Sequence, residues 1–191
     1  MKLFSYTLLF IFSLSFVSCS HGDKESAIGA TFEDADSFEN KYFTGNKISL
    51  AEFTQPCQYI SKAIVASMMS IPVEKVDYRP VPVEKKCVYT IIFNDDADQP
   101  DYTTGSLALV REVTGVEEEW KDNWSVKKGI SKSAEWVPNL GKAAIWNPSK
   151  RILEVKFEGY TLQVFPPKGP GKDTKNSKKW ALEMVKLAGF V

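Results

Sequence analysis

The chain has 191 residues, with 24 basic and 24 acidic side chains, so its formal net charge is zero. This balance argues against a nucleic-acid-binding protein, which would carry an excess of Lys and Arg over its binding face. Hydrophobic residues make up 43% of the chain and aromatic residues 13%, which is enough for a packed core and excludes a wholly disordered protein. The single histidine, His21, lies near the N-terminus, which disfavours histidine-dependent catalysis and a zinc site.

Residues 1–18 have the pattern of an export signal. Lys2 supplies one positive charge, and the run from Leu3 to Val17 contains no ionised side chain. A membrane-spanning helix needs about 20 apolar residues, so this run is short for a permanent span. Residues 20–23 contain no Lys or Arg that would stop transfer across the membrane. We therefore expect residues 1–18 to be removed as a signal peptide.

The run ends in Phe16-Val17-Ser18-Cys19, which resembles the lipobox of bacterial lipoproteins. Val17, Ser18 and Cys19 fit the pattern, and Phe16 stands where leucine is usual. The resemblance implies that the Cys19 thiol receives a diacylglycerol, that cleavage occurs before Cys19 and that the new amine is acylated. The alternative is an ordinary secretory signal that happens to end beside a cysteine.

The lipoprotein interpretation predicts a body held at a bacterial membrane surface by its N-terminus. Two or three acyl chains anchor a protein durably, because each buried methylene contributes about 0.8 kcal/mol. Ser20 lacks the acidic signal that retains some enteric lipoproteins in the inner membrane, so the outer membrane is favoured over the inner one.

Composition divides the rest of the chain into two parts. Residues 19–48 are rich in Gly, Ser, Asp, Glu and Asn, and the first part of this stretch reads as a tether. Its aromatic content, Phe32, Phe38, Tyr42 and Phe43, predicts that the second part packs on the domain. Residues 49–191 are predicted to form a single α+β domain.

Cys57 and Cys87 remain once Cys19 is assigned to the lipid. An even pair in an exported chain predicts one disulfide, here between a helix and a strand. The alternative is two buried free thiols, since small buried cysteines are common in cores. Neither cysteine belongs to a Cys-x-x-Cys motif, which disfavours redox catalysis.

Periodicity predicts the elements of the first half of the domain. Ile60, Ile64 and Met68 recur every four residues and predict a helix over 57–69. Residues 73–86, which include several prolines, read as an extended connection or an edge strand. A central strand is predicted over 87–93 and another strand over 106–113, joined by an acidic turn over 94–102.

The second half begins with a predicted helix over 115–128. Thr114 and Glu117 form a capping-box pair, and Trp120 and Trp124 belong to its buried stripe. Three strands are expected next, over 143–146, 153–158 and 160–165, the last two forming a hairpin in which apolar and charged residues alternate over 153–158. A final amphipathic helix is predicted over 174–188, with Trp180, Met184 and Leu187 on its inner face. This order of elements predicts an α+β fold, an antiparallel sheet with helices packed against it.

The domain also resembles a family of small cell-envelope lipoproteins of unknown function. The likeness rests on Cys57 opening a helix, on Cys87 opening a strand, and on the segment Val137-Pro-Asn-Leu-Gly-Lys-Ala-Ala-Ile-Trp146 followed by a hairpin. It covers most of residues 50–190 and implies a compact α/β sandwich, of which the PsbP-like fold is one candidate. It implies no active site.

Two patterns were weighed as ligand sites. Asn94, Asp96 and Asp98 have the spacing of the first ligands of a calcium loop, but Gln99 and Gly105 replace its glycine and its bidentate glutamate. A solvated acidic turn is therefore favoured, and no metal or cofactor is predicted. A basic cluster of lysines near the C-terminus reads as a solvated face, with contact to anionic headgroups as the alternative. The cluster comprises Lys168, Lys172, Lys175, Lys178 and Lys179.

Trp136 and Trp146 flank a turn that contains Asn139, and these three residues are the predicted ligand surface. The remaining tryptophans lie on helical inner stripes and read as core. With no catalytic constellation in the sequence, the favoured function is a lipid-anchored, non-catalytic envelope domain that binds a protein partner or a small ligand. The alternative is a hydrolase that uses carboxylates alone, acting on cell-wall or polysaccharide substrate.

Overall fold

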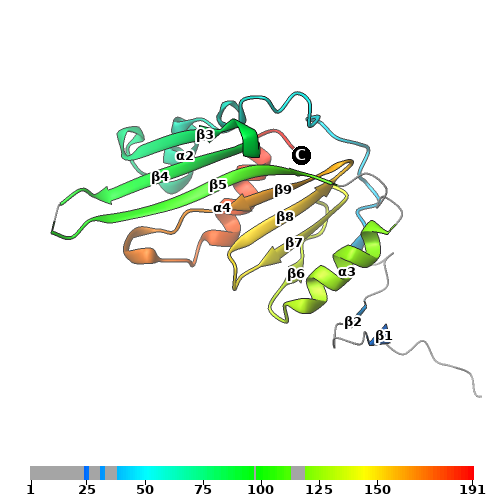
Figure 1. The fold of residues 1–191 in the computed structure, drawn as a ribbon. Helices are drawn as coiled ribbons and strands as arrows, with labels where there is room; N and C mark the ends of the chain where they lie inside the picture. Colours follow the sequence, from blue (N-terminus) through cyan, green and yellow to red (C-terminus); the bar gives the residue numbers. More distant parts are fainter. Residues whose placement is uncertain (1–23, 26–30, 33–37, 97, 113–118) are drawn as a thin grey trace, which may run out of the picture.

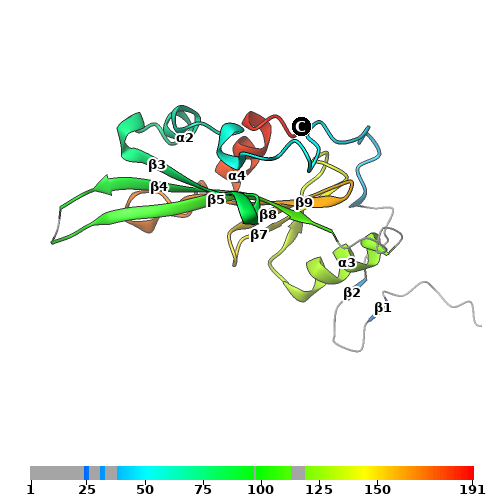
Figure 2. The same ribbon diagram turned by 45° about the horizontal axis from the view of Figure 1, so that its top comes forward.

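The computed structural model describes residues 24–25, 31–32, 38–96, 98–112 and 119–191. Seven strands form one sheet in the order β3-β4-β5-β9-β8-β7-β6, and every neighbouring pair is antiparallel. Helices α2 and α4 lie on one face of this sheet and α3 on the other (Figures 1 and 2). The predicted fold class, an antiparallel sheet with helices packed against it, is confirmed.

The strands alternate with short turns along the chain. A separate pair, β1 and β2, precedes the main sheet. The bounds are β1 Lys24–Glu25, β2 Thr31–Phe32, β3 Val76–Val81, β4 Lys86–Asn94, β5 Asp101–Arg111, β6 Glu135–Trp136, β7 Ala143–Asn147, β8 Ile152–Phe157 and β9 Tyr160–Phe165. The helices are α2 Lys62–Met69, α3 Trp120–Ile130 and α4 Ser177–Leu187, and the 3-10 turns are η1 Pro56–Gln58, η2 Val73–Lys75, η3 Pro82–Glu84 and η4 Pro170–Lys172.

The main core lies between the sheet and the α2–α4 layer. Alternate strand residues point to this side, among them Tyr89 and Leu107, and both are fully buried. Helix α4 contributes Ala181, Met184 and Val185, which are also fully buried. A disulfide joins Cys57 of η1 to Cys87 of β4, as predicted, so that η1 is tied to the first residues of an interior strand.

Helix α3 covers only one end of the opposite face. Trp120 and Trp124 pack with Ala143 and Ile145 of β7 in a second, smaller cluster, and Phe38 completes it by stacking on Trp136 with ring centroids 4.1 Å apart. In Figure 1 this helix lies beside β6 at one end of the sheet, while β3, β4, β5 and β9 carry no helix on that side. One face of the sheet is therefore covered along its length and the other is covered in part.

The alternation of apolar and charged residues over 153–158 predicts a strand with one face in water, and for β8 this prediction is wrong. Lys156 is only 2% exposed, although it alternates with the core residues Val155 and Phe157. Its ammonium group lies near the ring of Trp120, 5.7 Å from the centroid, and donates to Glu112 Oε2 at 2.6 Å. The charge is buried because α3 covers this end of the sheet, and it is paired because an isolated buried charge is costly.

The segment between residues 38 and 53 packs along the sheet. The Asn40 side chain donates to Gly141 O at 2.8 Å, and the Tyr160 hydroxyl donates to Ile48 O at 2.6 Å. Burial raises the pKa of the Tyr160 phenol above its ordinary value, because the phenolate would be poorly solvated. Of the aromatics predicted to pack here, Phe38 is buried and Phe43 packs against the main core, whereas Tyr42 is exposed.

The observed helices differ from the predicted ones at their ends. The helix predicted over 57–69 divides into η1 and α2, because Ser61 caps α2 by accepting a hydrogen bond from the Ile64 N–H. The predicted capping pair Thr114 and Glu117 lies outside the described residues. In α4, Leu187 is 47% exposed and not on the inner face, where Ala181 and Val185 lie instead.

The strands also depart from prediction at two places. Strand β5 begins at Asp101, so the predicted turn over 94–102 is shorter and the β4–β5 hairpin longer than expected. Strand β6 was not predicted, because it has only two residues and no measurable periodicity. Two alternatives were predicted for residues 73–86, an extended connection and an edge strand. The edge strand is confirmed, because β3 lies at the edge of the sheet.

We expect Gly141→Ala to destabilise the fold far more than Gly159→Ala. Both glycines have positive φ, 57° and 77°, where a side chain costs about 1 kcal/mol. A methyl group on Gly141 would also lie 2.5 Å from Val155 Cγ1 and 2.6 Å from Lys156 O, whereas one on Gly159 would meet nothing within 4 Å. Urea unfolding should show a loss of about 3 kcal/mol or more for Gly141→Ala and about 1 kcal/mol for Gly159→Ala. Equal losses would contradict this packing.

Candidate functional site

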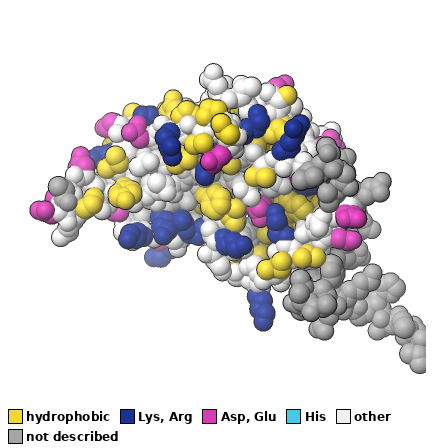
Figure 3. Space-filling view, viewed as in Figure 1, with side chains coloured by type: hydrophobic (Ala, Val, Ile, Leu, Met, Phe, Trp, Pro, Cys, Tyr) yellow, Lys and Arg dark blue, Asp and Glu magenta, His cyan; other side chains and the backbone are white. Residues whose placement is uncertain are grey.

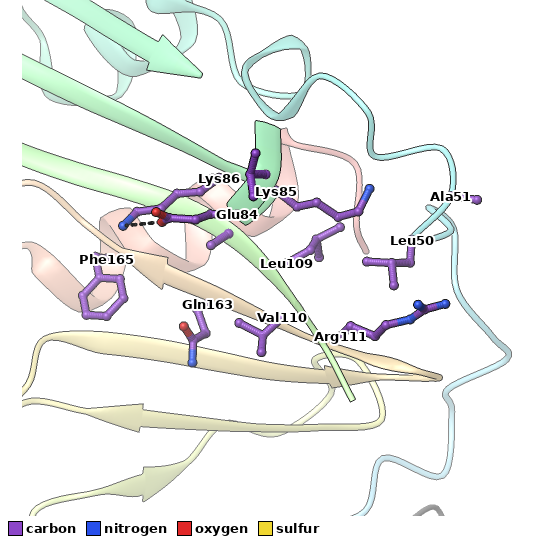
Figure 4. Close-up of a pocket in the computed structure, with 12 residues that line it drawn as sticks. Leu50, Ala51, Glu84, Lys85, Lys86, Leu109, Val110, Arg111, Gln163 and Phe165 are labelled. Atoms are coloured by element: carbon purple, nitrogen blue, oxygen red, sulfur yellow. Dashed lines mark ion pairs between the residues drawn. The ribbon is translucent and has the colours of Figure 1, made fainter. Parts of the chain in front are cut away.

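The uncovered part of the sheet carries a groove of about 720 Å³. It runs over the adjoining parts of β5 and β9, beside the start of β4 (Figure 4). Phe165 of β9 is paired with Ser106, and Arg111 of β5 is paired with Tyr160, so the groove extends over about five residues of this ladder, roughly 17 Å. We call it the β5 groove. It is lined by Leu50, Ala51, Val83, Glu84, Lys85, Lys86, Ala108, Leu109, Val110, Arg111, Gln163 and Phe165.

The floor of the β5 groove is apolar and partly in contact with solvent. Val110 is 44% exposed and Phe165 37% exposed, because α3 does not reach them. Val83, at the rim, is almost fully exposed. Figure 3 shows hydrophobic side chains interspersed with Lys and Arg on this face. The groove therefore offers apolar surface that water covers in the free protein and that a ligand could cover instead.

Positive charge exceeds negative charge around this floor. Lys85, Lys86 and Arg111 line the groove, and Glu84 is the single acidic lining residue. Lys86 lies 3.7 Å from Glu84 at the surface, a separation and exposure at which an ion pair contributes little. Figure 4 shows Arg111 and Lys85 extending on opposite sides of Leu50. The groove is suited to a ligand that is apolar in part and anionic in part.

Strand β5 continues past the strand that flanks it. The β4–β5 ladder ends at Lys86 and Ala108, and one further bond joins the Leu109 N–H to Lys85 O at 3.0 Å. The Lys85 N–H turns back to Pro82 O at 3.0 Å, because Lys85 has the left-handed conformation, φ 44°, at the end of η3. At Val110 and Arg111, β5 is paired with β9 alone among the described residues.

A short turn forms the wall opposite this strand end. The Ser49 N–H donates to Glu52 Oε2 at 2.8 Å, and the Glu52 N–H donates to Ser49 Oγ at 3.2 Å. The backbone bond from Ser49, followed by its hydroxyl, lowers the pKa of Glu52. These reciprocal bonds fix the backbone that carries Leu50 and Ala51. Lys85 ties the same wall to η3, because its ammonium group donates to Phe53 O at 3.1 Å.

A row of paired polar side chains separates the groove from α3. Glu154 accepts from Lys127 Nζ at 2.9 Å and from Gln163 Nε2 at 3.1 Å, and Gln163 also lines the groove. Next along the sheet, Glu112 accepts from Lys156 Nζ at 2.6 Å and from Thr161 Oγ1 at 3.2 Å. Both carboxylates therefore accept hydrogen bonds from side chains of the protein itself.

The predicted ligand surface is divided between two faces of the sheet. In the β6–β7 pair, Trp136 lies opposite Ile145 and Glu135 lies opposite Trp146, so the two indoles point to opposite sides. Trp146 is buried in the main core, and Trp136 stacks on Phe38 in the smaller cluster. Asn139 is exposed in the intervening turn, with φ 57°. The structure does not bring these three side chains onto one surface.

The acidic turn uses its side chains to hold its own backbone. Asn94 Oδ1 accepts from the Asp96 N–H at 3.0 Å, and Asp96 Oδ1 accepts from the Asp98 N–H at 3.0 Å. No group of three or more His, Cys, Asp or Glu side chains able to hold a metal ion was found among the residues that the structure describes. This spacing of acidic residues therefore serves turn geometry.

The basic cluster near the C-terminus does not converge on one point. Lys178 forms an ion pair with Glu135 at 2.8 Å, and Lys172 and Lys175 are exposed on and after η4. The Lys168 backbone N–H donates to Thr103 Oγ1 at 2.9 Å, which holds the loop against β5. Cys19 and His21 lie outside the described residues. Within the described part of the chain, no helix is long and apolar enough to cross a membrane.

The comparisons with known proteins gave no match. No protein-family model, no curated protein and no solved structure resembles the chain closely enough to be reported. The likeness to small envelope lipoproteins and to the PsbP-like fold therefore stays a prediction from short motifs.

Sequence patterns did not identify the β5 groove. Its residues come from three separate stretches of the chain, around residues 50, 85 and 110, with two more from β9. The sole local signal was the run Glu84-Lys85-Lys86 beside Arg79-Pro80-Val81-Pro82, which reads as an edge segment with surface charge. Recognising the groove requires knowing where β4 stops relative to β5.

We expect Lys156→Met to cost about 2–4 kcal/mol of unfolding free energy, because it leaves Glu112 without its buried cationic partner. Lys127→Met is the matched control. Its ion pair with Glu154 involves a lysine side chain that is 41% exposed, so the expected cost is below about 1 kcal/mol. Denaturant unfolding monitored by tryptophan fluorescence measures both. A cost for Lys156→Met no larger than for Lys127→Met would show that the buried pair does not hold the α3 end of the sheet.

Proposed function

We propose that this chain is a lipid-anchored cell-envelope protein whose domain binds, without catalysis, an amphipathic anionic ligand or part of a partner protein in the β5 groove. The observation that carries the binding site is the juxtaposition of exposed apolar side chains, Val110 and Phe165, with the cations Lys86 and Arg111. A bilayer, through the anchor, and one envelope partner or ligand, through the groove, are the two contacts of this protein.

The anchor rests on the N-terminal sequence. The uncharged run from Leu3 to Val17 passes directly into Ser18-Cys19, so the residue expected to be modified stands at the end of the export signal. Phe38 is packed on the domain and β2 contacts α3, so the folded body includes part of the described chain before residue 49. Ser20 favours sorting to the outer membrane in organisms that use an acidic retention signal.

The nature of the groove favours binding over hydrolysis. A glycosidase of the usual kind needs two facing carboxylates, about 5–10 Å apart, in a cleft. Among the lining residues the groove offers one carboxylate, Glu84, which lies 3.7 Å from Lys86. The neighbouring carboxylates of Glu112 and Glu154 accept hydrogen bonds from lysines. These pairings support the non-catalytic proposal over the carboxylate hydrolase.

Cys19→Ser should abolish lipid attachment. Metabolic labelling with a palmitate analogue, followed by membrane fractionation, should show a labelled, membrane-bound wild-type protein and an unlabelled variant. The double variant Cys57→Ser with Cys87→Ser is the control, because it removes the disulfide and leaves Cys19 in place. Unchanged labelling of the Cys19 variant would refute the anchor.

Arg111→Glu should weaken binding of an amphipathic anion in the groove. Anilinonaphthalene sulfonate is a suitable probe, with tryptophan-to-probe energy transfer measured on protein in phosphatidylcholine nanodiscs and empty nanodiscs as the blank. Reversing one of three lining cations should raise the dissociation constant about five- to tenfold and reduce its salt dependence. Lys172→Glu, the same charge change outside the groove, should leave the constant within about twofold. Equal effects of the two variants would contradict a specific groove.

A further inference from the structure

We propose that the β5 groove receives an extended segment of a partner polypeptide, which pairs with the free end of β5 as an added strand and places a carboxylate near Arg111. This inference rests on the proposed function and names the class of partner for the same site.

The backbone of β5 points unpaired groups into the groove. Along an antiparallel strand, the N–H and C=O of successive residues point alternately to the two neighbouring strands. The Leu109 N–H bonds to Lys85 O on the β4 side, and the Glu112 N–H bonds to Gly159 O on the β9 side. By this alternation, the N–H and C=O of Arg111 point to the β4 side, where β4 has already ended.

The carbonyl of Leu109 points the same way. In a regular ladder it would accept from the Lys85 N–H, but that N–H donates to Pro82 O instead. Two acceptors and one donor, namely the carbonyls of Leu109 and Arg111 and the Arg111 N–H, thus face the groove without a backbone partner among the described residues. An extended peptide supplies the complementary groups at the same spacing, which is the basis of strand addition.

The side chains around this edge fit an extended peptide in which apolar and acidic residues alternate. Leu50 and Val110 offer apolar contacts near the free edge of β5, and Phe165 extends the apolar floor along β9. Because side chains of a strand alternate between faces, an added strand would direct every second residue to this floor. The others would lie on the opposite face, toward Lys85 and Arg111, whose positive charge favours acidic residues or a terminal carboxylate. Lys86 is paired with Ala108 and therefore lies on the same face as Val110.

The unpaired carbonyls of Leu109 and Arg111 and the Arg111 N–H favour a peptide strand over a single-chain amphiphile as the ligand. A fatty acid could cover the apolar floor and pair with Arg111, yet it offers no donor to the two carbonyls and no acceptor to the Arg111 N–H apart from its head group. The paired length is short, because the free edge spans Leu109 to Arg111 and no more. Side-chain contacts along the floor must therefore supply much of the affinity.

The test uses the full chain in phosphatidylcholine nanodiscs and a ten-residue peptide of alternating Val and Glu, with the Val and Lys peptide of the same pattern as its control. Hydrogen exchange at single-residue resolution is the main readout. The acidic peptide should slow exchange of the Arg111 amide about tenfold or more, with little change at Glu112, whose N–H is already bonded to Gly159 O. Arg111→Gln should weaken binding of the acidic peptide about fivefold, because it removes the charge and keeps the N–H.

N-methylation of the peptide separates strand pairing from contact through side chains alone. Methyl groups on alternate peptide nitrogens should abolish binding in one of the two possible registers and leave it within about twofold in the other. The added strand would be contradicted if the peptides methylated in either register bound equally well, or if the peptide bound without protecting the Arg111 amide. Either result would still allow the groove to bind amphipathic anions. If neither the acidic peptide nor anilinonaphthalene sulfonate binds in a manner that depends on Arg111, the inference and the proposed function both fail. Saturable binding of dodecanoate with no binding of the peptide would assign the groove to an acyl carboxylate and contradict the proposal.

Discussion

The architecture depends on the incomplete cover of a single antiparallel sheet by helices α2, α3 and α4. Helices α2 and α4 and the segment from Phe43 to Phe53 cover one face, and α3 with Phe38 covers one end of the other (Figure 2). The buried Lys156–Glu112 pair and the stack of Phe38 on Trp136 fix the covered end. Strands β3, β4, β5 and β9 keep a face without a helix, and this incomplete cover is the origin of the groove.

The composition of the open face follows from its contact with water. Thr104 and Gln163 lie there with charged neighbours such as Lys86, which keeps most of the face hydrated. Val110 remains partly exposed where β5 extends past the end of β4, and Phe165 remains partly exposed on β9, level with Ser106. Natural proteins usually protect an open sheet edge, and η3 with the turn at Ser49–Glu52 protects most of this one. The part of the edge that they leave free spans Leu109 to Arg111.

Local sequence patterns predicted the elements well where periodicity is strong. The hairpin of β8 and β9, helix α4 and the Cys57–Cys87 disulfide were all found from alternation, amphipathicity and cysteine count. Features that depend on packing between distant parts of the chain were not predicted. The burial of Lys156 depends on α3, which packs against this end of the sheet, and the burial of Trp146 depends on which face of β7 meets the main core. The β5 groove escaped prediction because strand ends, not residue types, create it.

Among the residues that the structure describes, none pairs with the β4-side edge of β5 at Arg111. Hydrogen exchange of the free protein at single-residue resolution tests this most directly. The amides of Leu109 and Glu112 donate to Lys85 O and Gly159 O, so they should exchange about a hundredfold more slowly than the Arg111 amide between them. An Arg111 amide as protected as its two neighbours, with no ligand present, would mean that the edge is already closed and would contradict the account.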